Sequence, residues 1–352
     1  MSGPGTAPAA EDASLPTVSV VMPVYNSAWV LEECLRRILD QDYPREKMEL
    51  VLADGGSSDG TRELALRLGV GRVLDNPLRT GEAGKAVGVM AARHDIVALI
   101  DSDNLLPDRQ WLRRMVAPFA DPEVFASEPW DYTWRAEDSL ITRYCALLGM
   151  NDPLCYFLGN YDRRSVLSGT WTGLDLEQQD RGDWIKVGLR EDALPTIGAN
   201  GFLIRRADLL STQTQPYLFD IDCVYDLVRA GRSRVAKVKV GIIHLYCRGF
   251  GDFARKQRRR IRDYLYYRTH AQRRYPWASF PRARLVWFIV ATVLVLPTLA
   301  QALLGWIRSR DAAMLFHPLA CLATLGVYGS GVIRARLLGR SEILDRSGWG
   351  KR

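Results

Sequence analysis

The sequence predicts an α/β protein with a mostly parallel sheet, followed by a C-terminal pair of apolar helices. Three observations support this class. From Val18 onward, short β-branched stretches alternate with stretches of helical periodicity, as in βαβ units. Polar and glycine-rich segments directly follow the predicted strands, at the edge where an open α/β sheet binds ligands. Two long apolar stretches lie near the end of the chain.

The composition is that of a folded protein. The chain has 352 residues, of which 47% are hydrophobic, enough for one large domain or two ordinary ones. Its formal charge is +7, and residues 255–284 hold eleven Arg or Lys against one Asp, which points to an anionic partner there. The six cysteines show no CxxC pair, which indicates buried thiols in a reducing compartment. Residues 1–16 lack the features of a secretory signal and are expected to form a disordered tail.

The predicted elements follow one another along residues 17–270, which we expect to form one domain. Strands are predicted at residues 17–24, 48–53, 96–100 and 198–206, and helices at residues 28–39, 61–68 and 223–230. Residues 130–198 are rich in aromatic, charged and glycine residues without a clear period. They are predicted to be long inserted loops with short helices.

The two apolar stretches, residues 285–307 and 312–333, are each long enough to cross about 30 Å of hydrocarbon. Spanning helices would form a hairpin within residues 284–335, because only residues 308–311 separate them. Basic side chains are more abundant on the outer flanks, which predicts that both outer ends, including the tail at 336–352, are cytoplasmic. The alternatives are buried helices, or a re-entrant pair in one leaflet, which the prolines in both stretches favour.

Polar residues close the first two predicted strands. Pro23, Tyr25 and Asn26 end the first strand, and Asp54 ends the second, before a segment rich in glycine and serine. Glycines allow close approach of a ligand to the backbone, and Asp54 can accept a hydrogen bond from a nucleoside. Each segment alone is better explained by a turn with a helix cap. Together they indicate a ligand site.

The third predicted strand is followed by Asp101 and Asp103. Alternation along an extended strand points both carboxylates to the same side, where they can bind one hard divalent cation. Mg²⁺ or Mn²⁺ is predicted because the ligands are oxygens and no set of His and Cys accompanies them. The alternative is a solvated turn.

These segments, together with Gly84 and Lys85, resemble the successive motifs of the family 2 glycosyltransferases, which have the GT-A fold. The resemblance covers about residues 17–270. It implies that a nucleoside-diphosphate sugar is bound by Pro23, Tyr25, Asn26, Asp54, Gly84, Lys85 and Asp101. It also implies that Asp103, helped by Asp101, holds a metal ion on the diphosphate. The chain departs from the family pattern at Gly55, where the family has an acid, and at Ser27 and Ala28, where it often has Glu.

Asp220 and Asp222 match the spacing of the family's Glu-Asp-x-Asp-Leu segment, with Phe219 in place of the Glu. The resemblance makes Asp220 the general base that deprotonates an acceptor hydroxyl, and Asp222 its neighbour or substitute. The alternative is that Asp220 caps the helix predicted at 223–230.

Gln257 and Arg260 match the Gln-x-x-Arg-Trp motif of processive members such as cellulose and hyaluronan synthases, with Ile261 in place of Trp. The match implies that Arg260 offsets charge on the leaving diphosphate. A juxtamembrane helix attracted to anionic lipid is an equally good interpretation of this basic segment.

The resemblance implies an inverting, metal-dependent transfer of a sugar to a hydroxyl of a lipid or lipid-linked glycan at the cytoplasmic membrane face. One sugar per acceptor is expected, because two membrane helices are few for a polymer channel. Two alternatives remain: a polyprenyl-phosphate glycosyltransferase similar to dolichyl-phosphate mannose synthase, and an inactive scaffold that binds nucleotide sugar or lipid. Nucleic-acid binding is not expected, because the basic segment lacks interleaved aromatic residues.

Overall fold

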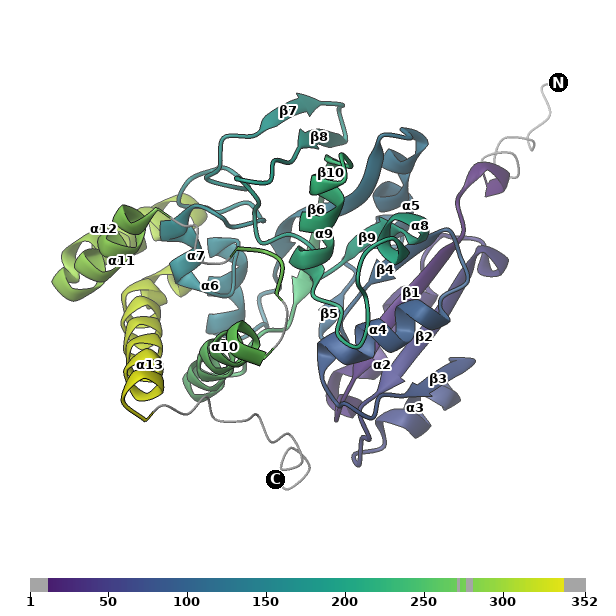
Figure 1. Cartoon of the computed structure of the whole chain (residues 1–352), viewed down its shortest axis with the longest axis horizontal. Helices are drawn as coiled ribbons and strands as arrows, with labels where there is room; N and C mark the ends of the chain where they lie inside the picture. Colours follow the sequence, from purple (N-terminus) through teal and green to yellow (C-terminus); the bar gives the residue numbers. More distant parts are fainter. Residues whose placement is uncertain (1–11, 271–272, 277–280, 339–352) are drawn as a thin grey trace. The chain divides into compact units, whose positions relative to one another are not determined.

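A computed structural model of the chain describes residues 12–270, 273–276 and 281–338 (Figure 1). It divides into two compact units. The first unit comprises residues 1–129, 176–190 and 198–242, and the second comprises residues 130–175, 191–197 and 243–352. The tails expected at residues 1–16 and 336–352 lie mostly outside the described residues.

The first unit is built on one mixed sheet of ten strands. Their order is β3-β2-β1-β4-β9-β6-β10-β8-β7, with β5 paired to β10. The strands are β1 (Val18–Val24), β2 (Met48–Asp54), β3 (Arg72–Asp75), β4 (Ile96–Leu99), β5 (Asn104–Leu105), β6 (Val124–Thr133), β7 (Glu177–Asp180), β8 (Trp184–Gly188), β9 (Phe202–Arg205) and β10 (Arg234–His244). The neighbours β3, β2, β1 and β4 are parallel. β9 is antiparallel to β4 and β6, and β8 is antiparallel to β7 and β10. The α/β class is confirmed.

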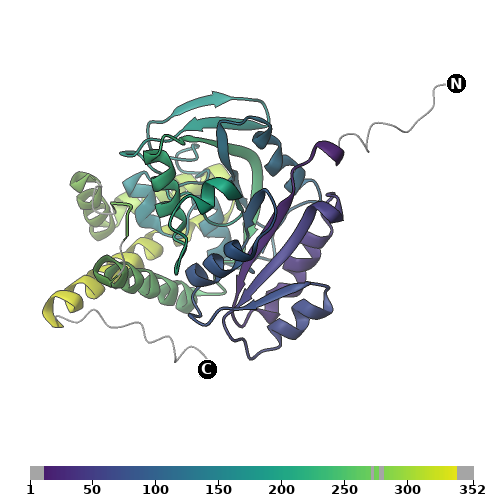
Figure 2. The same ribbon diagram turned by 45° about the vertical axis from the view of Figure 1, so that its right-hand side comes forward.

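Helices pack against the parallel half of this sheet (Figure 2). The first unit contains the helices α2 (Ala28–Leu39), α3 (Thr61–Arg67), α4 (Gly81–Ala91), α5 (Trp111–Val116), α8 (Arg206–Leu210) and α9 (Asp220–Arg229). Helix α4 contacts β1 and β2. The helix can pack this closely because Gly84 and Gly88 have no side chain. A Cβ on Gly88 would lie 2.4 Å from Val21, and one on Gly84 would lie 2.8 Å from Pro23. Four residues apart, these glycines share one helix face.

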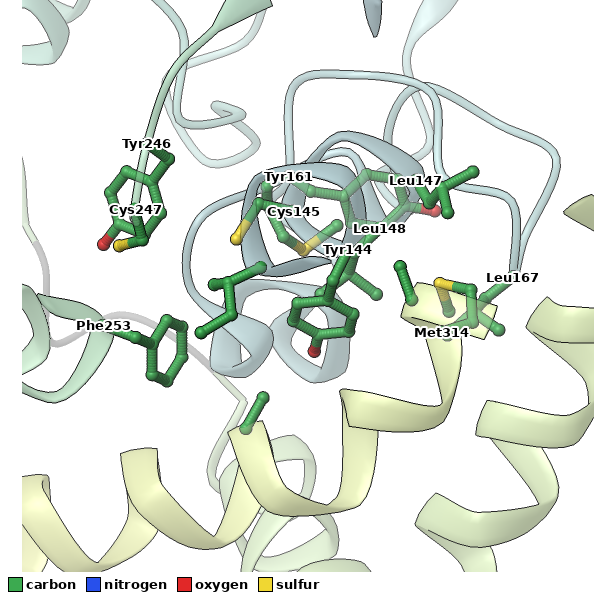
Figure 3. Packing of buried hydrophobic residues seen from close by; sticks show 14 residues of the cluster. Tyr144, Cys145, Leu147, Leu148, Tyr161, Leu167, Tyr246, Cys247, Phe253 and Met314 are labelled. Atoms are coloured by element: carbon green, nitrogen blue, oxygen red, sulfur yellow. The ribbon is translucent and has the colours of Figure 1, made fainter. Parts of the chain in front are cut away.

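The second unit is helical. It contains α6 (Leu140–Leu148), α7 (Pro153–Leu158), α10 (Phe250–His270), α11 (Arg282–Leu294), α12 (Leu296–Ser309), the short 3₁₀ turn η3 (Ala312–Phe316) and α13 (His317–Leu338). Tyr144 and Leu148 of α6, Phe253 of α10 and Met314 of η3 belong to one buried cluster (Figure 3). The C-terminal helices therefore share a core with elements that precede them in the chain.

The first apolar stretch differs from its prediction. Instead of one helix it forms α11 and α12, which are bent by 89° relative to each other. At the break Val295 has a φ of 62°, and Pro297 follows in the first turn of α12, where a missing N–H is tolerated. By length and composition, one continuous helical segment, Ala312–Leu337, could cross a membrane, and the bent pair passes the same test only when taken together.

Several elements were missed or misplaced by the sequence. The region at 130–198, predicted as loops with short helices, also contains the end of β6 and the β7–β8 hairpin. The four residues of β7 are all polar and exposed, so the sequence has no alternation of apolar and polar residues that would predict this strand. β9 begins at Phe202 rather than at residue 198, and α9 begins at Asp220 rather than at residue 223.

Candidate active site

The loops that follow β1 and β2 are bonded to each other. The backbone N–H of Asn26 donates to Ser57 Oγ at 2.9 Å, and the N–H of Ser58 donates to Asn26 Oδ1 at 2.9 Å. Asn26 has a φ of 49°, a left-handed conformation that asparagine tolerates better than most residues. These bonds hold the carboxyl ends of the two strands together, as their parallel pairing predicts.

Asp54 is buried at the end of β2, with 5% of its surface exposed. Its Oδ1 accepts from the Ser57 hydroxyl at 2.6 Å and from the Ser57 N–H at 3.1 Å. Beside it, a Cβ on Gly55 would lie 3.2 Å from the ring of Tyr25. The structure therefore brings together Tyr25, Asn26 and Asp54. Gly84 instead faces Pro23, so both of those residues serve the packing of α4.

Asp101 and Asp103 lie in a turn and not on an extended strand. Strand β4 ends at Leu99, and the N–H of Asn104 donates to the Asp101 carbonyl at 2.9 Å. The argument from strand alternation was therefore wrong. Both carboxylates nevertheless lie near the buried thiol of Cys34, whose pKa is raised by burial first and then by Asp103 and Asp101.

Lys85 of α4 and Asp220 of α9 form an ion pair, with 2.7 Å between Nζ and Oδ2. Their side chains are 9% and 19% exposed, respectively. Burial alone would lower the pKa of Lys85, but the negative charges of Asp220 and Asp101 raise it above its ordinary value. Lys85 is therefore a cation paired with Asp220, and the negative charge of Asp101 also stabilises it.

Asp220 is the first residue of α9, and no side chain caps this helix at Phe219. The interpretation of Asp220 as a helix cap is therefore wrong. Burial raises its pKa to about 6, although Lys85 acts to lower it. Its Oδ1 is buried and has no hydrogen-bond partner among the described residues. Asp222 differs, because its side chain is wholly buried.

A buried ion pair behind Asp220 was not predicted. Lys237 Nζ of β10 lies 2.8 Å from Glu128 Oε2 of β6, and both side chains are 0% exposed. The other oxygen of Glu128 accepts from the Gly198 N–H at 3.1 Å. Gly198 has a φ of 117°, and a Cβ there would lie 2.5 Å from the Cβ of Asp220. The pair thus fixes the backbone against which Asp220 rests.

The residues present fit a hard divalent cation that is partly held by its substrate. Within the described ranges, no group of three or more His, Cys, Asp and Glu side chains forms a complete metal site. Mg²⁺ typically takes one or two carboxylates and completes its shell with water and substrate phosphates. The turn at 101–104 offers two carboxylates and no nitrogen or sulfur ligand. Oδ1 of Asp220, which has no hydrogen-bond partner among the described residues, is a further oxygen of the first unit that can still accept a proton donor or a cation.

Gln257 and Arg260 lie in the second unit, on α10. Arg260 Nη1 donates to Gln257 Oε1 at 2.9 Å and lies 3.6 Å from Asp152 Oδ2. Gln257 is 0% exposed, and its Nε2 donates to the Asn151 carbonyl at 2.9 Å. The Arg260 side chain is 40% exposed. Gln257 therefore orients a guanidinium that can still reach a ligand.

The second unit also contains a cavity of about 560 Å³. Its polar and aromatic lining includes Asp131, Trp134, Arg164, Ser168, Arg308 and Ser309. The guanidiniums of Arg164 and Arg308 line the cavity together with the carboxylate of Asp131, and Arg308 Nη1 donates to the Val166 carbonyl at 3.2 Å. Arg164, which forms no ion pair with the described part of the chain, is therefore the cation most open to an anion. Sequence reasoning did not find this cavity, because its lining comes from four separate segments.

Residues 19–136 match the model of Glycosyl transferase family 2. With the fold described above, this match identifies a family 2 glycosyltransferase domain of the GT-A type within the chain. Glycosyltransferase AglE of Haloferax volcanii is 34% identical over 116 residues, which are 32% of this chain and 38% of that protein. Succinoglycan biosynthesis protein ExoA of Rhizobium meliloti is 38% identical over 119 residues, which are 31% of this chain and 36% of that protein. The chain thus spans well under two thirds of the length of either relative.

Among solved structures, the fold is similar to that of the mannosyltransferase PcManGT from Pyrobaculum calidifontis in complex with GDP-Man and Mn²⁺. The TM-score is 0.54 at 18% sequence identity, over 94% of this chain and 89% of that chain. At this identity the likeness shows the GT-A fold.

Proposed function

We propose that the chain is an inverting glycosyltransferase. It moves a sugar from a nucleoside-diphosphate sugar to a hydroxyl group of a lipid or lipid-linked glycan at the cytoplasmic membrane face. The observation that carries the proposal is the Lys85–Asp220 pair, with the charge of Asp101 close enough to raise the pKa of both. This arrangement occurs within a unit whose strand ends match family 2.

On the donor side, Tyr25, Asn26 and Asp54 would contact the nucleoside. Asp103 and Asp101 would hold Mg²⁺ or Mn²⁺, which when bound offsets negative charge on the diphosphate. The complex of PcManGT with GDP-Man and Mn²⁺ supports a nucleotide-sugar donor and an ion of this kind. Lys85 adds a positive charge that is retained at neutral pH.

On the acceptor side, Asp220 would act as the general base. As the acceptor oxygen attacks the anomeric carbon, its proton passes to Asp220 and the bond from that carbon to the diphosphate oxygen breaks. Inversion at the carbon follows, and no covalent bond to the enzyme forms. A carboxyl with a pKa of about 6 is mostly ionised at neutral pH and remains basic enough to take the proton. Asp222 is too buried to meet the acceptor itself.

In the second unit, Arg260 would offset charge on the departing diphosphate, and Gln257 would orient it. The polar cavity beside α12 would receive a phosphate group of the acceptor, since Arg164 and Arg308 both line it. The apolar C-terminal helices would hold the protein at the membrane, with the glycosyltransferase domain on the cytoplasmic side.

The decisive experiment uses Asp220→Asn in the full-length protein. Donor binding is measured by screening nucleotide sugars for thermal stabilisation in the presence of Mn²⁺, and transfer is then assayed with the same ion. The variant is expected to bind the donor normally and to lose at least a hundredfold in transfer, because a base typically contributes a factor of about 10² to 10⁴. Unchanged transfer to a polyprenyl phosphate would instead establish the polyprenyl-phosphate alternative, since a phosphate needs no strong base. Donor binding without transfer to any acceptor, already in the wild type, would indicate a binding scaffold.

A further inference from the structure

We infer that α11, α12 and α13 form an in-plane anchor that lies along one leaflet of an anionic bilayer and does not cross it. The inference rests on the proposed membrane attachment and deepens it. The hairpin expected from the sequence places residues 308–311 on the far side of the membrane. The contacts within the second unit place these residues on the same side as α6 and α7.

The bent pair begins and ends at one segment of the second unit. Arg284, near the start of α11, donates to the Leu158 carbonyl, and Arg308, near the end of α12, donates to the Leu167 carbonyl. The segment at 159–166 contains Asp162, Arg163 and Arg164, so it does not cross hydrocarbon. The bent pair therefore returns to the side from which it starts.

The connection between α12 and η3 is also bonded to a helix that lies outside the hydrocarbon, on the side where the bent pair begins. Asp311 forms an ion pair with Arg143 of α6 at 3.4 Å, and its side chain is 15% exposed. A bilayer cannot separate the two partners of a direct ion pair. Residues 308–311 consequently lie next to α6.

Helix α13 packs along its length on elements outside the hydrocarbon. Near its start the His317 ring forms a hydrogen bond of 2.8 Å with the Tyr144 hydroxyl, and further along Tyr328 donates to Gln257 at 3.0 Å. A Cβ on Gly331 would lie 3.1 Å from Ile261 of α10. These contacts extend over about 21 Å of helix. Because α10 carries a run of exposed arginines, it stays in water and keeps α13 beside it.

The faces that α11 and α12 leave open are apolar. Side chains at least 44% exposed include Trp287, Val293, Leu294, Leu296, Trp306 and Ile307. The helices have 13 and 14 residues, so each is about 20 Å long and shorter than the roughly 30 Å of hydrocarbon. An exposed apolar surface of this kind marks an interaction site, and tryptophans close in the chain to exposed arginines, as Trp306 is to Arg308 and Arg310, are typical of a lipid interface. A bilayer surface with anionic headgroups is therefore the partner that fits.

A topology measurement tests the anchor without requiring enzyme activity. Ser309→Cys in the full-length protein is treated with a membrane-impermeant maleimide, in intact cells and in inverted membrane vesicles. Glu63→Cys, on an exposed position of α3, is the matched control, and the wild type gives the background from native thiols. We expect Ser309→Cys to be labelled like Glu63→Cys, only in inverted vesicles. Labelling of Ser309→Cys in intact cells would overturn the in-plane anchor.

A depth measurement provides the second arm. A nitroxide on Val293→Cys, in vesicles of phosphatidylcholine and phosphatidylglycerol, is expected about 5 to 10 Å below the phosphates. A label near the bilayer centre, about 15 Å deep, contradicts the anchor, because residues near the break would lie there in a spanning hairpin. A lipid-free dimer that buries the label, with no vesicle binding, also contradicts it. If the protein has no transferase activity but shows the expected depth and labelling, the proposed enzymatic function is contradicted and the in-plane anchor stands.

Discussion

The Lys85 ammonium lies 2.7 Å from the Asp220 carboxylate, although 135 residues separate them in the chain. The pair joins α4, which packs on the parallel strands, to α9, which follows the antiparallel strand β9. It also places one oxygen of Asp220 against Lys85 and leaves the other without a partner among the described residues. A carboxylate held in this way is oriented and still able to accept a proton.

Removing Lys85 is expected to move the acid limb of the pH–rate profile to higher pH. The proposed base must be ionised, so transfer falls as the pH drops through the pKa of Asp220, which is about 6. Lys85 lowers this pKa, and in Lys85→Ala it rises. Profiles of kcat/KM for the wild type, Lys85→Ala and Lys85→Arg measure the shift. An acid limb that stays in place in Lys85→Ala would show that Asp220 is not the titrating base.

Asp103→Ala is expected to abolish turnover that depends on Mn²⁺ while the fold stays intact. The loss follows if the turn at 101–104 supplies the carboxylates for the ion. Binding of Mn²⁺, followed by its electron paramagnetic resonance in the presence of a nucleoside diphosphate, gives a readout besides activity. Glu63→Ala, at an exposed position of α3, serves as the control. Full activity of Asp103→Ala, or of the wild type in excess chelator, would refute the metal role.

Lys237→Met is expected to lower the free energy of unfolding by about 3 to 5 kcal/mol, because it removes the ammonium that lies 2.8 Å from the buried Glu128 carboxylate and compensates its charge. The double variant Glu128→Leu/Lys237→Met should recover much of this loss, since it removes both charges of the pair. Urea unfolding measures both effects. If the single and double variants are equally unstable, the charge of Glu128 is not what destabilises the core.

Arg260→Ala is expected to lower turnover about a hundredfold with a smaller effect on donor affinity, because the charge on the diphosphate grows as the glycosidic bond breaks. Arg258→Ala is the matched control, because Arg258 is exposed on the same helix. Both are assayed in detergent with a saturating soluble acceptor analogue, which removes membrane binding. Similar small losses in the two variants would assign the basic segment to lipid contact.

Arg164→Ala is expected to raise the KM for a phosphate-bearing acceptor about tenfold and to leave kcat nearly unchanged. Loss of one charge-assisted hydrogen bond, worth about 1.5 kcal/mol, gives a change of this size. The side chain is exposed and makes no ion pair with the described residues, so its removal leaves the fold intact. Acceptor titrations at saturating donor, with Arg258→Ala alongside, measure the effect. An unchanged KM would remove the cavity from the acceptor site.

Local chemistry along the chain determined much of this protein. β1 is almost wholly buried, so its apolar residues alone predicted a core strand. The polar residues that follow β1, and Asp54 at the end of β2, predicted the edge of the sheet that faces a ligand. The predicted strand, the loop that follows it and the motifs that carry the family resemblance are each defined by residues only a few positions apart in the chain. For this reason the family match agrees with what residues 18–104 predicted. The roles of the individual site residues stay predictions.

Only the tertiary structure decided which distant residues meet. No local pattern pairs Lys85 with Asp220 or Glu128 with Lys237, because such pairs depend on which strands become neighbours and on how closely a glycine lets two backbones approach. The apolar stretch at 285–307 has the length of a membrane span, yet its break at Val295 and the contacts of Arg284 and Arg308 return it to one segment. Hydrophobicity predicted two helical stretches with apolar surfaces. The long-range contacts of Arg284 and Arg308 decided that both ends of the first stretch lie beside residues 158–167.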